Sequence, residues 1–77
     1  MNILIKYFAH YREKTGKKEE YVEGDFKTVG ELVAYLEENY KIGTESLMIA
    51  VNRRVVTEEK HLSQGDEVAI FPPVSGG

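Results

Sequence analysis

Alternation of apolar and polar positions predicts a strand near each end of the chain. Residues 2–9 form the first, and their side chains divide between two faces, with Ile3, Ile5 and Tyr7 on one and Leu4, Lys6 and Phe8 on the other. Residues 67–71 form the last, with Val68 and Ile70 facing opposite to Glu67, Ala69 and Phe71. One face of each strand is wholly apolar and should be buried. The other face carries charges and should lie closer to water.

A helical period marks residues 29–40 as the main helix. Its apolar residues recur at i, i+3, i+4 and i+7 spacing and form one stripe, which is Val29, Leu32, Val33 and Leu36, extended by Tyr40. Thr28 and Glu31 have the spacing of a capping box, in which each side chain satisfies the other residue's backbone N–H. Gly43 is the expected stop. The stripe should pack on the core.

Shorter segments complete the predicted order: a helical turn at residues 11–14 ended by Gly16, and strands at residues 18–22, 47–51 and 55–56. The order strand, strand, helix, strand, short strand, strand packs most economically as a mixed sheet with one helix across it. This is the β-grasp arrangement of the α+β class, with the first and last strands adjacent and parallel at the centre. We expect one domain, residues 1–71, and a flexible tail, residues 72–77.

The tail, Pro72-Pro73-Val74-Ser75-Gly76-Gly77, presents its chemistry at the chain end. The two prolines cannot donate ladder hydrogen bonds, so they end the strand. Gly76 and Gly77 have two competing interpretations. Either the two glycines belong to a frayed end with no role, or they are selected to thread a narrow active site that a Cβ atom would block. We favour the second interpretation, in which the carboxylate of Gly77 is presented for activation.

An apolar set on the wetter sheet face predicts a partner site beside the tail. Phe8 and Phe71 fall on the outward parity of neighbouring strands, Leu4 and Ala69 share that face, and Val55 joins from the short strand. A contiguous exposed apolar patch indicates a binding surface. The competing interpretation is that loops of the same chain cover the patch. A partner that gripped it would be placed to draw the tail into its own catalytic pocket.

Composition excludes several other functions. The chain has no cysteine, which removes disulfides and thiolate sites, and His10 and His61 lack companions at metal-ligand spacing. The net charge of −3 disfavours nucleic-acid binding. We expect no membrane span and no signal peptide, hence a cytoplasmic location. Adjacent pairs Glu19-Glu20, Glu37-Glu38 and Glu58-Glu59 point apart and are interpreted as solvated surface, so nothing predicts independent catalysis.

Three segments carry a resemblance to a known family: residues 7–13 (Tyr-Phe-Ala-His-Tyr-Arg-Glu), 50–52 (Ala-Val-Asn) and 62–77 (Leu-Ser-Gln-Gly-Asp-Glu-Val-Ala-Ile-Phe-Pro-Pro-Val-Ser-Gly-Gly). They resemble the small, sulfur-carrying subunits of molybdopterin synthase, the MoaD family of ubiquitin-like β-grasp proteins. The resemblance runs from the first strand to the last residue, and its final segment is the most specific. Tyr7 stands where another aromatic residue is common.

This resemblance implies a sulfur carrier that is not an enzyme on its own and binds no cofactor. In that family an E1-like adenylyltransferase uses ATP to activate the terminal carboxylate, here that of Gly77, and a sulfur donor protein then gives a thiocarboxylate. The large synthase subunit, in a heterotetramer, transfers the sulfur to cyclic pyranopterin monophosphate, which yields molybdopterin for the molybdenum cofactor. The matching partner-facing positions are Phe8, Val55, Phe71, Pro72, Pro73, Val74 and Ser75, and the reacting end is Gly76 and Gly77.

Three alternatives stay open. A thiamine-pathway sulfur carrier shares the fold and the diglycine, although Phe71-Pro72-Pro73 looks less like it. A ubiquitin-like protein modifier forms isopeptide bonds through Gly77. A plain interaction module has no use for the diglycine, so deletion of Gly76 and Gly77 would leave its function intact.

Overall fold

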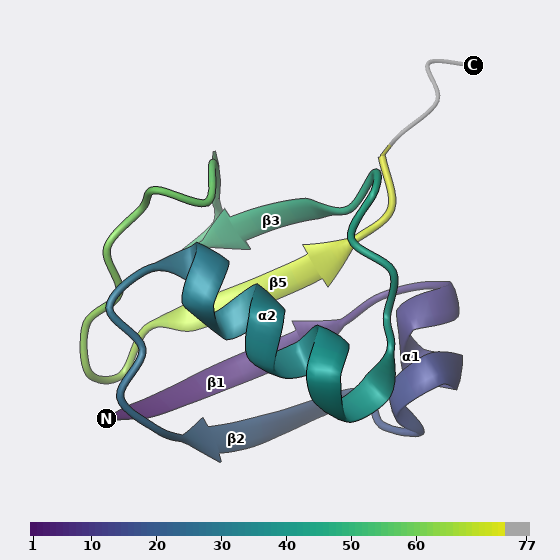
Figure 1. The fold of residues 1–77 in the computed structure, drawn as a ribbon, viewed down its shortest axis with the longest axis horizontal. Helices are drawn as coiled ribbons and strands as arrows, with labels where there is room; N and C mark the ends of the chain where they lie inside the picture. Colours follow the sequence, from purple (N-terminus) through teal and green to yellow (C-terminus); the bar gives the residue numbers. More distant parts are fainter. Residues whose placement is uncertain (74–77) are drawn as a thin grey trace.

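The computed structural model describes residues 1–73 as a five-stranded sheet with one long helix across it (Figure 1). The elements are β1 (Asn2–Tyr7), α1 (His10–Thr15), β2 (Glu19–Glu23), α2 (Val29–Tyr40), β3 (Met48–Val51), β4 (Arg54–Val56) and β5 (Glu67–Phe71). The strand order is β2-β1-β5-β3-β4, with β1 and β5 parallel and the other neighbours antiparallel. This confirms the predicted mixed sheet with its parallel pair of first and last strands.

The core lies between the sheet and α2. From the sheet, Ile3, Ile5 and Tyr7 of β1 and Val68 and Ile70 of β5 are fully buried. The residues of α2 packed on them are those of the predicted stripe: Val29, Leu32, Val33 and Leu36. Burying one large aliphatic side chain is worth about 1.5–3 kcal/mol. This layer therefore holds α2 against one face of the sheet and leaves the opposite face open.

The ends of α2 differ in detail from the prediction. At the start, Thr28 Oγ1 accepts from the Glu31 backbone N–H at 3.3 Å, which is the first half of the capping box. The Glu31 carboxylate accepts from the backbone N–H of Lys27 at 3.0 Å and not from that of Thr28, so the second half is shifted by one residue. At the other end, Lys41 and not Gly43 is the left-handed residue that ends the helix, with φ 52°.

The connection from β1 to β2 is built around a short helix. β1 ends at Tyr7, two residues earlier than predicted, because Ala9 adopts φ 55° and turns the chain out of the sheet. α1 follows and ends at Gly16, whose φ of 76° suits the missing Cβ. In the part of the chain that the structure describes, neither helix has the length and apolarity needed to cross a membrane.

Candidate functional site: an apolar groove on the open sheet face

An open apolar groove of about 440 Å³ lies on the face of the sheet that α2 does not cover, and its lining is Phe8, Ala69, Phe71 and Pro72. The Phe8 backbone N–H donates to Ile70 O at 3.0 Å, so the residue after β1 remains tied to β5. Phe8 keeps 38% of its surface exposed. The parallel pairing of β1 and β5 therefore places two aromatic rings beside the point where the chain leaves the sheet.

The strand register explains which predicted residues share this face. Ala69 lies beside Lys6 of β1 and Ala50 of β3, and Ala50 lies beside Val55 of β4. Val55 is therefore on the open face, as predicted, with 63% of its surface exposed, but two strands away from Ala69 and outside the groove lining. Within residues 1–73, Phe8 and Val55 are not covered, which does not support the interpretation that loops of the same chain bury the patch.

One ion pair interrupts the apolar face. Lys6 Nζ lies 3.6 Å from Glu67 Oε1, and both side chains are about one-third exposed. A pair this exposed is worth roughly 0–1 kcal/mol to stability. Because the two charges compensate each other, covering them with an apolar partner costs less than covering an isolated charge would.

The groove contains no reacting group. Its four lining residues carry no acid, base or nucleophile on their side chains. Pro73, which follows the groove, is exposed. The predicted site residues Val74, Ser75, Gly76 and Gly77 lie outside the described residues, so their roles stay predictions.

A cluster of polar side chains that the sequence did not reveal ties β1, β2 and α2 together. The Glu20 carboxylate accepts from the hydroxyls of Tyr7 and Tyr40, each at 2.7 Å, and from Lys17 Nζ at 3.0 Å. Burial opposes the ionisation of Glu20, but these three hydrogen bonds outweigh it and hold its pKa below the usual value. Burial, with Glu20 nearby, raises the pKa of Tyr7.

This cluster corrects the interpretation of Glu20 in the pair Glu19-Glu20 as solvated surface, because the Glu20 side chain is partly buried and hydrogen-bonded. Its hydrogen-bonded pairs are separated by up to 23 positions along the chain, as in the 2.8 Å bond from Lys17 Nζ to the Tyr40 hydroxyl, so no local pattern joins them. The Tyr7 hydroxyl is the group that distinguishes this residue from a purely apolar aromatic. The cluster fixes the end of α2 against the sheet and does not face the open groove.

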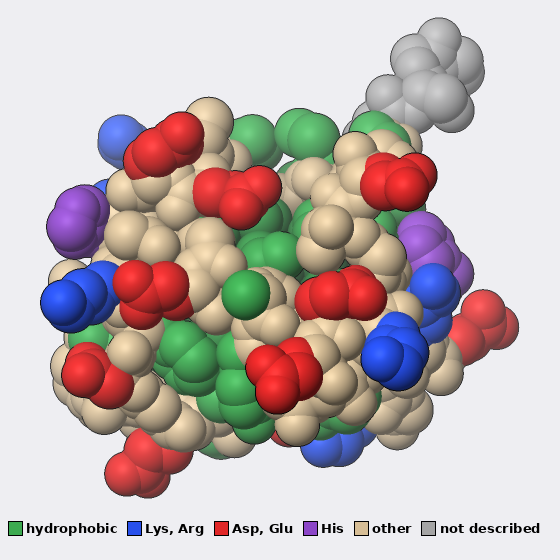
Figure 2. All heavy atoms as spheres, in the orientation of Figure 1, with side chains coloured by type: hydrophobic (Ala, Val, Ile, Leu, Met, Phe, Trp, Pro, Cys, Tyr) green, Lys and Arg blue, Asp and Glu red, His purple; other side chains and the backbone are tan. Residues whose placement is uncertain are grey.

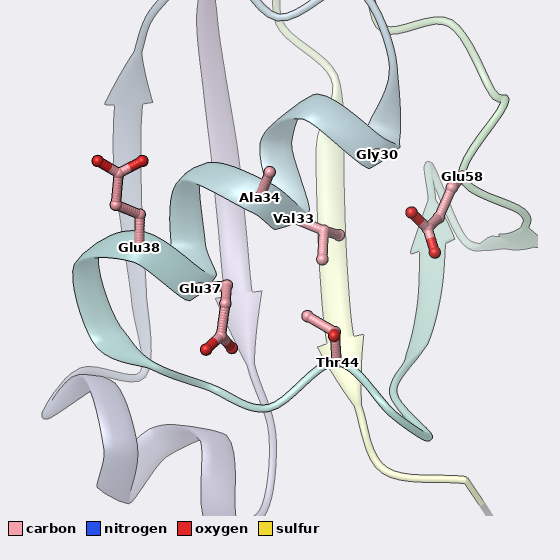
Figure 3. A pocket seen from close by; sticks show the side chains of 7 residues that line it. All are labelled: Gly30, Val33, Ala34, Glu37, Glu38, Thr44 and Glu58. Atoms are coloured by element: carbon pink, nitrogen blue, oxygen red, sulfur yellow. The ribbon is translucent and has the colours of Figure 1, made fainter.

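The opposite face of the molecule is acidic. Asp and Glu side chains are spread over the face that α2 covers (Figure 2). A second groove of about 380 Å³ lies there between α2 and the segment after β4 (Figure 3), lined by Gly30, Val33, Ala34, Glu37, Glu38, Thr44 and Glu58. Its Glu37 carboxylate accepts from the Gly43 N–H at 2.7 Å and so supports the helix end. Among residues 1–73 no cluster of His, Cys, Asp or Glu is arranged to hold a metal ion.

The sheet order, the crossing helix and the open apolar face together define a ubiquitin-like β-grasp protein. The solution structure of small archaeal modifier protein 1 from Methanosarcina acetivorans has the same fold. It matches with a TM-score of 0.81 and 27% identity, covering 99% of this chain and 96% of that chain. The chain belongs to the ThiS family, whose sequence pattern matches residues 5–77.

A curated relative and a further solved structure are also similar to this chain. The molybdopterin synthase sulfur carrier subunit of Escherichia coli (strain K12) is 39% identical over 80 residues, which cover 97% of this chain and 99% of the relative. A chain in the complex of subunits 1 and 2 of the molybdopterin-converting factor from Helicobacter pylori 26695 is 24% identical with a TM-score of 0.72, which shows the fold alone. The resemblance inferred from residues 7–13, 50–52 and 62–77 is confirmed at the level of the family.

Proposed function

We propose that this protein is the sulfur carrier subunit of a molybdopterin synthase. The observation that carries the proposal is the 39% identity with the Escherichia coli subunit over nearly the whole of both chains. The groove adds a docking surface that ends at Pro72, the first residue of the tail. In this proposal the open sheet face binds the partner, and the tail delivers the sulfur.

The chemistry takes place at Gly77. At an E1-like adenylyltransferase the Gly77 carboxylate attacks the α-phosphorus of ATP, pyrophosphate leaves, and an acyl adenylate forms. The terminal sulfur of a persulfide on a donor protein then attacks the carbonyl carbon, and AMP leaves, so that an acyl disulfide joins Gly77 to the donor. A second thiol of the donor cleaves the S–S bond, which leaves a disulfide on the donor and frees the Gly77 thiocarboxylate. Because the chain has no cysteine, the chain end is where it can hold sulfur. Gly76 and Gly77, which lack Cβ atoms, fit a channel too narrow for other residues.

The large synthase subunit supplies the catalytic groups in this proposal. The carrier's own groove is lined by apolar residues without an acid, base or nucleophile, as suits a non-catalytic subunit that docks its partner. Phe8, Phe71 and Pro72 make the central contact. Val55 and Pro73 lie around it, while Val74 and Ser75 lead towards the reacting end. The chain with this fold in the Helicobacter pylori complex is assembled with a second subunit.

The remaining parts of the proposal follow from this chemistry. The assembly is a heterotetramer of two large and two small subunits. The carrier itself binds no cofactor, and the activating enzyme consumes the ATP. We place the protein in the cytoplasm, where ATP is available to that enzyme.

Reconstitution tests the proposal. The protein is mixed with the large subunit, an E1-like adenylyltransferase, ATP, a sulfur source and cyclic pyranopterin monophosphate, and molybdopterin is quantified. Molybdopterin should form, with two carriers consumed per product because the dithiolene holds two sulfur atoms. A variant lacking Gly77 is the matched control and should give none. The proposal fails if the full chain gives no product while the Escherichia coli carrier does so under the same conditions.

A second candidate function is protein modification. The likeness to small archaeal modifier protein 1 over nearly the whole chain favours it. The same activated Gly77 would then be attacked by a lysine amine in place of a sulfur nucleophile. Peptides from cells that carry Gly77 in an isopeptide bond to lysine would support this function. A thiamine-pathway carrier is the remaining alternative, and restoring growth of a thiamine-requiring strain would favour it.

A further inference from the structure

Arg12 of α1 lies at the edge of the open-face groove in a fixed position. Its guanidinium carbon is 5.6 Å from the centre of the Phe8 ring. Its Nε donates to the backbone oxygen of Tyr7 at 2.9 Å. A cation above an aromatic ring is attracted by it, and the guanidinium plane suits such stacking. The two contacts, made to consecutive residues, hold the guanidinium beside the aromatic wall of the groove.

The backbone around Ala9 produces this arrangement. Ala9 has φ 55° and ψ −134°, a conformation that costs a non-glycine residue about 1–3 kcal/mol. It turns the chain out of the sheet so that α1 begins at His10, with Ala9 as its N-cap. The Tyr11 N–H donates to Phe8 O at 3.2 Å, and the Arg12 N–H donates to Ala9 O at 3.0 Å. The side chain of Arg12 therefore lies over the ring of Phe8, four residues earlier in the chain.

The rest of the guanidinium is available to a ligand. Arginine presents five N–H donors in a rigid fork. Within residues 1–73 only Nε of Arg12 has a hydrogen-bond acceptor, and neither ion pair of this part of the chain includes Arg12. The residue is exposed. By contrast, the charges of Lys6 and Glu67 on the same face compensate each other. Among the residues that the structure describes, Arg12 thus has no charge partner and gives the groove a positive charge at one edge.

We propose that Arg12 binds a carboxylate side chain of the large synthase subunit, next to the apolar residues of that subunit that fill the groove. This inference rests on the proposed function and names the chemistry of its partner. A guanidinium fork matches the two oxygens of a carboxylate, which an ammonium group cannot do. Arginine is also enriched among the residues that dominate interface energies. The groove supplies contact area, and Arg12 fixes the orientation in which the partner docks.

Binding of the full chain to the large subunit is measured by titration calorimetry for three variants. Arg12→Gln removes the charge, Arg12→Lys keeps the charge but removes the fork, and Lys14→Gln removes one positive charge from the same helix as the matched control. Arg12→Gln should weaken binding about tenfold or more, as expected for loss of a hydrogen bond between charged groups. Arg12→Lys should weaken it in the same direction. Lys14→Gln should stay within about twofold of the wild type, as expected of a surface charge with no specific partner.

Salt dependence separates recognition of a carboxylate from mere support of Phe8. The affinity of the wild type should fall as NaCl is raised, and that of Arg12→Gln should fall clearly less. The inference is overturned if Arg12→Lys binds as tightly as the wild type, if Lys14→Gln loses as much as Arg12→Gln, or if the salt slopes of wild type and Arg12→Gln coincide. Failure of the wild type itself to bind the large subunit would instead overturn the proposed function.

Discussion

Replacing Phe8 by serine should weaken docking without unfolding the protein. Phe8 lines the groove and keeps 38% of its surface exposed, so much of its ring contributes nothing to the folded chain's own core. When a partner covers the groove, that exposed part of the ring is removed from water. The substitution therefore acts mainly on the complex and much less on the isolated carrier.

The exposed area sets the expected size of the effect. A phenylalanine has about 200 Å² of accessible surface, so the exposed fraction corresponds to about 75 Å². At about 25 cal/mol per Å² its burial contributes about 2 kcal/mol to docking. That free energy corresponds to a dissociation constant about 30-fold larger for Phe8→Ser.

Titration calorimetry with the large subunit measures this change, and Tyr35→Ser is the matched control. Tyr35 is an aromatic residue with 37% of its surface exposed, but it lies on α2, on the opposite side of the sheet. Tyr35→Ser should bind within about twofold of the wild type, as residues outside an interface do. Thermal unfolding of each variant shows that the fold is retained. Equal losses for the two variants, or no loss for Phe8→Ser, would refute the assignment of the groove.

Three further predictions concern stability and the tail. Leu36→Ala should lower the free energy of unfolding by about 2–5 kcal/mol in urea titrations, because Leu36 is fully buried; a loss below that range would mean that the core closes over the cavity. Glu20 has a lowered folded pKa, so its contribution is present above the ordinary carboxyl pKa of 4.5 and is lost as pH falls through the folded value. Unfolding of Glu20→Gln should accordingly depend less on pH than that of the wild type below about pH 4.5, and parallel profiles would contradict the role of the cluster. One residue added after Gly77 should abolish sulfur transfer and leave docking intact, and surviving transfer would exclude a reacting terminal carboxylate.

Residues with a regular period were predictable from the sequence. The apolar stripe from Val29 to Leu36, extended by Tyr40, predicted α2 with the bounds that the structure has. Apolar residues repeated every 3.6 positions form a single face only in a helix. The alternation in residues 67–71 likewise predicted which side chains of β5 are buried. The parity of Phe8 and Phe71 then predicted a shared outer face, which the parallel pairing of β1 and β5 brings together.

Features that depend on tertiary contacts were not predictable. The hydrogen bonds of Glu20 to Tyr7, Tyr40 and Lys17 join segments that are distant in sequence, and a glutamate in the pair Glu19-Glu20 has no local mark of burial. The position of Arg12 over Phe8 depends on the φ of Ala9, a residue type that rarely adopts positive values. The helix stop at Lys41 was missed for a related reason, because Lys41, like Ala9, is a non-glycine residue with a positive φ, and its N–H closes the last turn by a bond to Glu37 O.

Intact-mass spectrometry tests the central claim most directly. The protein is incubated with ATP, an E1-like adenylyltransferase and a sulfur source, and its mass is compared with that of the untreated chain. The account predicts a gain equal to one sulfur atom replacing one oxygen atom, localised by fragmentation to Gly77. An unchanged mass, with the same enzymes loading a control carrier in parallel, would contradict it.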